Sequence, residues 1–75
     1  MSETRELIEF LFTYHAPTPE MIEKLKTVRE AAKALAVAID ESCPPSADRT
    51  AAMRDLQTAV NTANRSIVLE GRGYR

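Results

Sequence analysis

The sequence predicts an all-α protein in which a short N-terminal helix precedes a long antiparallel two-helix hairpin. Two observations predict this fold. Proline-containing breaks at 17–19 and 43–46 divide the chain into three segments, and each segment has apolar residues at helical spacing. Proline ends a helix that precedes it and favours the start of a helix that follows it. The predicted helices cover about residues 3–14, 18–41 and 46–69 of a single helical hairpin domain, 1–75.

The first predicted helix is short and amphipathic. Its apolar side chains are Leu7, Ile8, Leu11 and Phe12, and their spacing places them on one face of a helix. A helix of this length is only marginally stable on its own.

The two long helices each have a start signal and an apolar seam. Thr18 and Ser46 are the expected N-caps, and Pro19 suits the first turn that follows Thr18. Gly71 and Gly73 are expected to mark the end of the third helix. The short connection between the long helices predicts an antiparallel pair. The seams advance in alternating steps of four and three residues, as in coiled coils: Met21, Leu25, Val28, Ala32, Leu35 and Ile39, then Met53, Leu56, Val60, Ala63 and Ile67.

The length and cysteine content limit how such a chain can be stabilised. A chain of 75 residues buries too little surface to be more than marginally stable alone. A single cysteine, Cys43, cannot form an intramolecular disulfide. Cys43 and His15 are not spaced like a zinc site, so we expect no metal and no cofactor. Association with copies of itself is therefore the expected source of stability.

Several classes of function are disfavoured. No apolar run is long enough to span a membrane, and no secretory signal is visible, so we expect a cytoplasmic protein with no membrane partner. His15 has no serine or cysteine partner at a recognisable spacing. Both glycines lie in the C-terminal tail, so there is no glycine-rich phosphate loop. We expect no catalytic residues and therefore no enzyme.

Basic residues are arranged in a way that suits a small anionic ligand. Lys26, Arg29 and Lys33 are spaced i, i+3, i+7, so they line one face of the second helix beside its seam. A solvated basic face is the alternative. Every basic residue after position 42 is an arginine, whose planar guanidinium suits bidentate phosphate contacts. The formal net charge of −1 argues against DNA as a partner.

Aromatic and polar residues add candidates for ligand contact. Tyr14 and His15 lie just before the first break, where an aromatic ring can stack on a nucleobase. The alternative is that Tyr14 covers the hairpin end with Phe10 or Phe12. Polar side chains also lie away from the seam of the third helix, either exposed or directed to a ligand or a second subunit: Thr50, Arg54, Asn61, Asn64 and Arg65.

Several segments together resemble a known family. They are Tyr14–Glu20, Val28–Ala32, Cys43–Ser46, Asp55–Val60 and Ala63–Arg65. Their order and spacing resemble the hairpin domain of phage anti-CBASS cyclic-nucleotide sponges, a domain shared with Thoeris anti-defence sponges. The resemblance extends over about residues 12–67.

The resemblance implies a homohexamer that acts in the bacterial cytoplasm. It implies binding of cyclic dinucleotides such as cyclic GMP-AMP between subunits, and of cyclic trinucleotides at a separate pocket in some members. The signal is held and not cleaved. Tyr14 then stacks on a base and Arg29 meets a phosphate. At the trinucleotide site, Arg49 or Arg54 would have to replace a basic residue that relatives have near Ala47.

The complete set of predicted ligand-binding residues joins both lines of reasoning: Tyr14, His15, Lys26, Arg29, Lys33, Arg49, Thr50 and Arg54. The alternative interpretation is a small helical adaptor that uses its alanine-rich face or the apolar stripe 7–12 to bind a host or phage protein.

Overall fold

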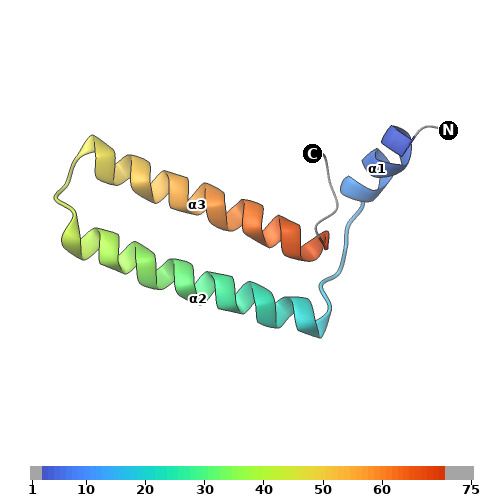
Figure 1. Cartoon of the computed structure of the whole chain (residues 1–75), viewed down its shortest axis with the longest axis horizontal. Coiled ribbons are helices and arrows are strands. Elements are labelled where there is room, and N and C mark those ends of the chain that lie inside the picture. The colour runs from blue at the N-terminus through green and yellow to red at the C-terminus, as the bar shows by residue number, and fades with distance from the viewer. Residues whose placement is uncertain (1–2, 71–75) are drawn as a thin grey trace.

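The computed structural model describes residues 3–70 and consists of three helices, α1 (Glu3–Leu11), α2 (Pro19–Ser42) and α3 (Ala47–Val68). Helices α2 and α3 run antiparallel in a single elongated layer, and α1 lies beyond the open end of this hairpin (Figure 1). The chain extends over 53 × 28 × 17 Å. The described residues contain no strand, and the predicted all-α hairpin is confirmed. The expectations for Gly71 and Gly73 lie outside the described residues.

The start of each long helix follows from its capping residue. The Thr18 hydroxyl accepts a hydrogen bond from the Met21 amide at 3.2 Å, and Pro19 is the first helical residue. The Ser46 hydroxyl accepts from the Arg49 amide at 3.1 Å in the same way. Each cap satisfies an amide that would otherwise lack a partner in the first helical turn. Both predicted caps are confirmed.

The tip of the hairpin is held by contacts between the two long helices. Arg49 in the first turn of α3 forms an ion pair with Asp40 near the end of α2. The other terminal nitrogen of its guanidinium donates to the Cys43 carbonyl at 3.5 Å. The Ser46 hydroxyl donates in turn to the Pro44 carbonyl at 3.1 Å. The connection 43–46 is thus fixed by side chains from both of its flanks.

The seam between α2 and α3 follows the predicted pattern with one correction. Leu35 was expected in the seam, but its side chain is 51% exposed, and the half-buried position is Ala36 instead. After Ala32 the next half-buried residue of α2 lies four residues further on, at Ala36, and not three residues further on, at Leu35. Leu35 therefore lies outside the seam. The half-buried residues of the seam are Met21, Leu25, Val28, Ala32, Ala36, Ile39, Met53, Leu56, Val60, Ala63 and Ile67.

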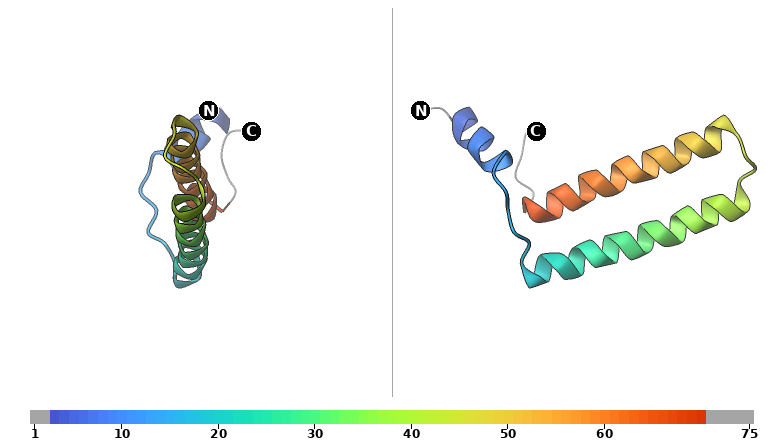
Figure 2. Two further views of the ribbon diagram at one scale, coloured as in Figure 1. Left: turned by 90° about the vertical axis from the view of Figure 1, so that its left-hand side faces the viewer. Right: turned by 180° about the vertical axis from the view of Figure 1, so that it is seen from behind.

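Helix α1 ends earlier than the predicted limit near residue 14. After Leu11 the backbone tightens, because the Thr13 amide donates to the Phe10 carbonyl, three residues back and not four. The segment to Pro19 is extended and turns toward α2 (Figure 2). Within the described residues, α2 and α3 are the packed pair, and α1 stands outside it.

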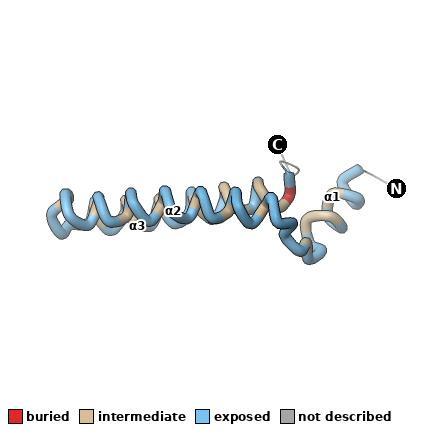
Figure 3. Tube along the Cα trace, turned by 90° about the horizontal axis from the view of Figure 1, so that it is seen from below, coloured by how far each residue is buried: buried red, intermediate tan, exposed pale blue. Residues whose placement is uncertain are grey.

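The hairpin has almost no enclosed interior. Leu69, which is 6% exposed, is the only buried residue among the described residues, and it lies at the end of α3 (Figure 3). Large apolar side chains stay in contact with solvent, among them Ile8 and Phe12 of the N-terminal region and Leu35 and Val37 of α2. Two helices pack along one line only, so each leaves most of its surface uncovered.

Candidate functional site

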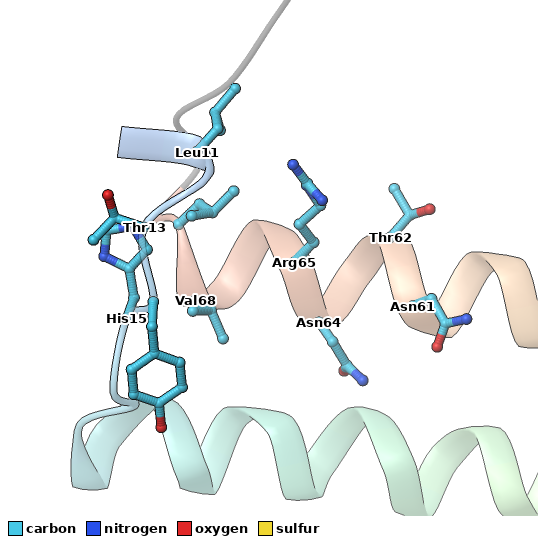
Figure 4. A pocket seen from close by; sticks show the side chains of 10 residues that line it. Leu11, Thr13, His15, Asn61, Thr62, Asn64, Arg65 and Val68 are labelled. Atoms are coloured by element: carbon cyan, nitrogen blue, oxygen red, sulfur yellow. The ribbon is translucent and has the colours of Figure 1, made fainter. Parts of the chain in front are cut away.

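A hollow of about 620 Å³ lies at the open end of the hairpin, where the segment after α1 meets the last turns of α3 (Figure 4). This volume is within the range of small-molecule sites, about 300–1,000 Å³. Asn61 and Asn64 point from α3 toward α2, whereas Thr62 and Arg65 point away from α2. The lining residues are Leu11, Thr13, Tyr14, His15, Asn61, Thr62, Asn64, Arg65, Val68 and Leu69.

The aromatic ring of this hollow is almost fully available. Tyr14 is 85% exposed, although it lines the hollow. Its neighbours are held in place, because the Thr13 hydroxyl donates to the Glu9 carbonyl and the His15 imidazole lies 2.6 Å from the Phe10 carbonyl. The hollow therefore presents a flat apolar ring on a fixed stretch of backbone.

A second hollow of about 490 Å³ lies further along the hairpin between α2 and α3. Arg29 and Lys33 stand on its α2 side, and Gln57 and Asn61 stand on its α3 side. Its floor consists of seam residues: Ala32, Ala36, Met53, Leu56 and Val60. The two alanines have small side chains, so the floor is open between the charged and amide groups.

The two hollows adjoin on one face of the molecule. Asn61 lines both of them, and the spacing of Gln57, Asn61 and Asn64 places these amides on one face of α3. Among residues 3–70, no aspartate or glutamate lines either hollow, whereas Arg29, Lys33 and Arg65 do. The residues that line the two adjoining hollows therefore include an aromatic ring, three amides and three cations.

Asn64 has an unusual environment in this face. Its Oδ1 atom is buried and has no hydrogen-bond partner among the described residues. A buried acceptor without a partner costs about 1–3 kcal/mol of stability. Sequence reasoning noted the polar character of Asn61 and Asn64 but did not choose either as a ligand residue, and it missed Gln57. Their helical spacing on the flank of the seam is the signal that could have found them.

A third hollow of about 420 Å³ lies at the tip of the hairpin. Arg49 and Thr50 line it, but the guanidinium of Arg49 already contacts Asp40 and the Cys43 carbonyl. An anion at the tip would therefore compete with a carboxylate for this arginine.

The structure divides the eight predicted ligand residues among separate places. Tyr14 and His15 lie at the open end, Arg29 and Lys33 in the middle, and Arg49 and Thr50 at the tip. Lys26 and Arg54 are exposed and line none of these three hollows. The middle and open-end residues line two hollows that share Asn61, and the tip residues line a separate hollow.

Neither a metal site nor a membrane span is found in the described part of the chain. Among the described residues, no three histidine, cysteine, aspartate or glutamate side chains gather closely enough to hold a metal ion. None of the described helices is both long enough and apolar enough to cross a lipid bilayer.

The fold and the two hollows define a class of protein: a helical hairpin whose adjoining hollows are lined by an aromatic ring, amides and cations. Residues 4–68 match the model of the Acb2/Tad1 hairpin domain, and the chain belongs to this family. It is the family of anti-CBASS and anti-Thoeris sponges, and membership implies binding of cyclic-nucleotide signals. The resemblance inferred from the sequence is thereby confirmed. Comparison with curated proteins and with solved structures gave no match.

Proposed function

We propose that the protein is a phage anti-defence sponge that binds cyclic dinucleotides along the face shared by the two adjoining hollows. The observation that carries this proposal is the placement of Tyr14 and Arg29 in hollows that share Asn61 and have no acidic lining residue. Cyclic dinucleotides contain two bases and two phosphates. Tyr14 would stack on a base, and Arg29 with Lys33 would contact phosphate oxygens.

The ligand is held and not cleaved in this proposal. The open-end hollow is lined by the hydroxyls of Thr13 and Thr62 and by the imidazole of His15. Each of these groups contacts a backbone carbonyl, those of Glu9, Thr58 and Phe10 respectively, so neither hydroxyl is paired with the imidazole as a nucleophile and its base would be. Sequestration requires tight binding without turnover, and it would act in the cytoplasm of the bacterial host, where the signal reaches its effectors.

A homohexamer completes the proposed site. The described residues enclose one buried side chain, Leu69, and leave Ile8, Phe12 and Leu35 exposed. A chain of this length that encloses so little apolar surface is only marginally stable alone, and association with further copies would supply the missing burial. Both hollows are open at the surface of one chain, so a second subunit would close them around the ligand and would supply the second aromatic ring and cation.

A separate site for cyclic trinucleotides would use Arg49, Thr50 and Arg54 near the tip. Arg49 contacts Asp40, so the phosphate has to displace a carboxylate or share the guanidinium with it. We therefore expect cyclic trinucleotides to bind less tightly than cyclic dinucleotides.

A thermal-shift titration tests the proposed function directly. The wild-type protein is titrated with cyclic GMP-AMP, other cyclic dinucleotides and cyclic trinucleotides, with linear dinucleotides as controls. A ligand that binds only the folded form stabilises it by about 2.7 kcal/mol at a hundredfold excess over its Kd. We expect a large shift with cyclic dinucleotides, and recovery of the intact ligand after incubation. No shift with any cyclic nucleotide would overturn the proposal.

A helical adaptor is the second candidate function. The observation in its favour is that α1 stands outside the packed helix pair with Ile8 and Phe12 exposed. An adaptor predicts a host or phage protein bound through the stripe 7–12 and no response to nucleotides. Leu7→Glu would then abolish partner binding, whereas the sponge predicts that nucleotide binding depends on Tyr14 and Arg29.

A further inference from the structure

The backbone on either side of Tyr14 is tied to the last turn of α1. The Thr13 hydroxyl donates to the Glu9 carbonyl. The carbonyl of Phe10 accepts from the Thr13 amide at 3.5 Å and lies 2.6 Å from Nε2 of His15. Both carbonyls lie in the last turn of α1. Thr13 and His15, the two residues that flank Tyr14, therefore both contact the end of this helix.

The contact of His15 has a defined direction and a second component. A backbone carbonyl can only accept, so Nε2 of His15 must carry the hydrogen. The imidazole also lies against the ring of Phe10, with centroids 4.5 Å apart and planes tilted by 48°. His15 is half-buried, whereas Tyr14 beside it is 85% exposed. The imidazole is therefore engaged with α1, and the phenol is presented to solvent.

Fixing this backbone matters for an exposed ring. The side chain of Tyr14 makes no hydrogen bond to any described residue, so its position depends on the main chain that carries it. Ordering a free segment at the moment of binding costs conformational entropy and weakens affinity. A segment that is already held avoids this cost.

We propose that His15 is a positioning residue that ties the segment after α1 to the Phe10 carbonyl and so presents Tyr14 to the ligand. His15 itself does not contact the ligand. This inference rests on the proposed function, because it assigns to His15 a role in the same site. In this inference α1 holds the backbone that carries the aromatic ring, through the carbonyls of its last turn.

A double-mutant cycle separates positioning from direct contact. His15→Ala, Tyr14→Leu and the double variant are titrated with cyclic GMP-AMP, and the ligand is raised until each thermal shift saturates. We expect His15→Ala to weaken binding roughly three- to tenfold, the loss typical of one hydrogen bond. In the Tyr14→Leu background the same change should have no further effect, because residues that act as one unit are not additive.

Conservative variants identify which contact of His15 matters. His15→Gln keeps an N–H donor and loses the aromatic ring, whereas His15→Phe keeps a ring against Phe10 and loses the donor. We expect His15→Gln to bind within about threefold of wild type and His15→Phe to resemble His15→Ala. Thr13→Val should weaken binding in the same direction. Thr27→Val is its matched control, because the Thr27 hydroxyl makes the same type of bond to the Glu23 carbonyl in α2 at 3.0 Å.

The outcomes distinguish this inference from the proposed function. If His15→Ala leaves affinity unchanged while Tyr14→Leu weakens it, the positioning role is wrong and the sponge proposal stands. If His15→Ala weakens binding equally in both backgrounds, His15 contacts the ligand directly and the inference is wrong. If the wild-type protein shows no response to any cyclic nucleotide, both proposals fail together.

Discussion

The two ends of the hairpin are built from similar residue types and use them differently. At the tip, the polar side chains are engaged with one another: Arg49 contacts Asp40 and the Cys43 carbonyl, and Ser46 caps α3. At the open end, Tyr14 is exposed, and the Oδ1 atom of Asn64 is buried without a hydrogen-bond partner in the described part of the chain. These polar groups of the tip stabilise the fold, whereas Tyr14 and the amide oxygen of Asn64 are candidates for contact with a ligand or a second subunit. The difference lies in the contacts that each residue makes and not in its residue type.

The largest effect that the comparison predicts is loss of ligand binding at the open end and middle. Tyr14→Ala combined with Arg29→Ala should abolish the thermal shift with cyclic dinucleotides, because stacking alone is worth about 1–3 kcal/mol per base. Light scattering after gel filtration should show an unchanged assembly. Lys24→Ala is the matched control, since Lys24 lines a hollow with Glu20 and Glu70 on the opposite side of the seam. Binding that survives the double substitution would place the ligand elsewhere.

Asn64 offers the second test of the comparison. Replacing it with leucine, a side chain of similar size, removes a buried acceptor whose lack of a partner costs about 1–3 kcal/mol. We therefore expect Asn64→Leu to raise the midpoint of thermal unfolding without ligand and to weaken the binding of cyclic dinucleotides. A lower midpoint would mean that the amide is hydrogen-bonded in the assembled protein.

The sequence predicts where the helices begin better than it predicts which side chains lie in the seam between them. Thr18 and Ser46 are local signals, because a cap depends on amides only three residues away, and both caps are present. Leu35 was misplaced because a strict alternation of steps ignores the drift of a helix of 3.6 residues per turn. The seam position belongs to Ala36. A choice by hydrophobicity alone selects Leu35, because leucine is the more apolar of the two neighbours.

The site shows the same limit. The basic spacing of Arg29 and Lys33 was visible in the sequence, and the structure places both in one hollow. The engagement of Arg49 with Asp40 was not visible, because these residues belong to different helices and meet only when the connection 43–46 turns. Sequence periodicity describes one helix at a time, so contacts between helices remain beyond it.

Removing the cap at the tip should have an intermediate effect. Ser46→Ala leaves the Arg49 amide without its acceptor, and N-cap substitutions of this type cost about 0.5–2 kcal/mol. We expect a lower midpoint in chemical or thermal unfolding, with an unchanged Kd for cyclic dinucleotides because the tip lies outside the proposed site. If Ser46→Ala instead raised the Kd and left the unfolding midpoint of the wild type unchanged, the tip would take part in ligand binding. Ser66→Ala, near the end of the same helix, is the control for loss of a hydroxyl.

The ion pair at the tip should have the smallest effect on stability and a distinct effect on anions. Asp40 is 61% exposed at its side chain, so the pair with Arg49 contributes about 0.2–1 kcal/mol. Asp40→Asn should therefore lower the unfolding midpoint slightly, and the difference should shrink at high ionic strength. The same change frees the guanidinium from a competing carboxylate, so the affinity for cyclic trinucleotides should rise while that for cyclic dinucleotides stays constant. If trinucleotide affinity instead falls or does not change, Arg49 serves the hairpin connection alone, and the contrast between a structural tip and a binding open end becomes complete.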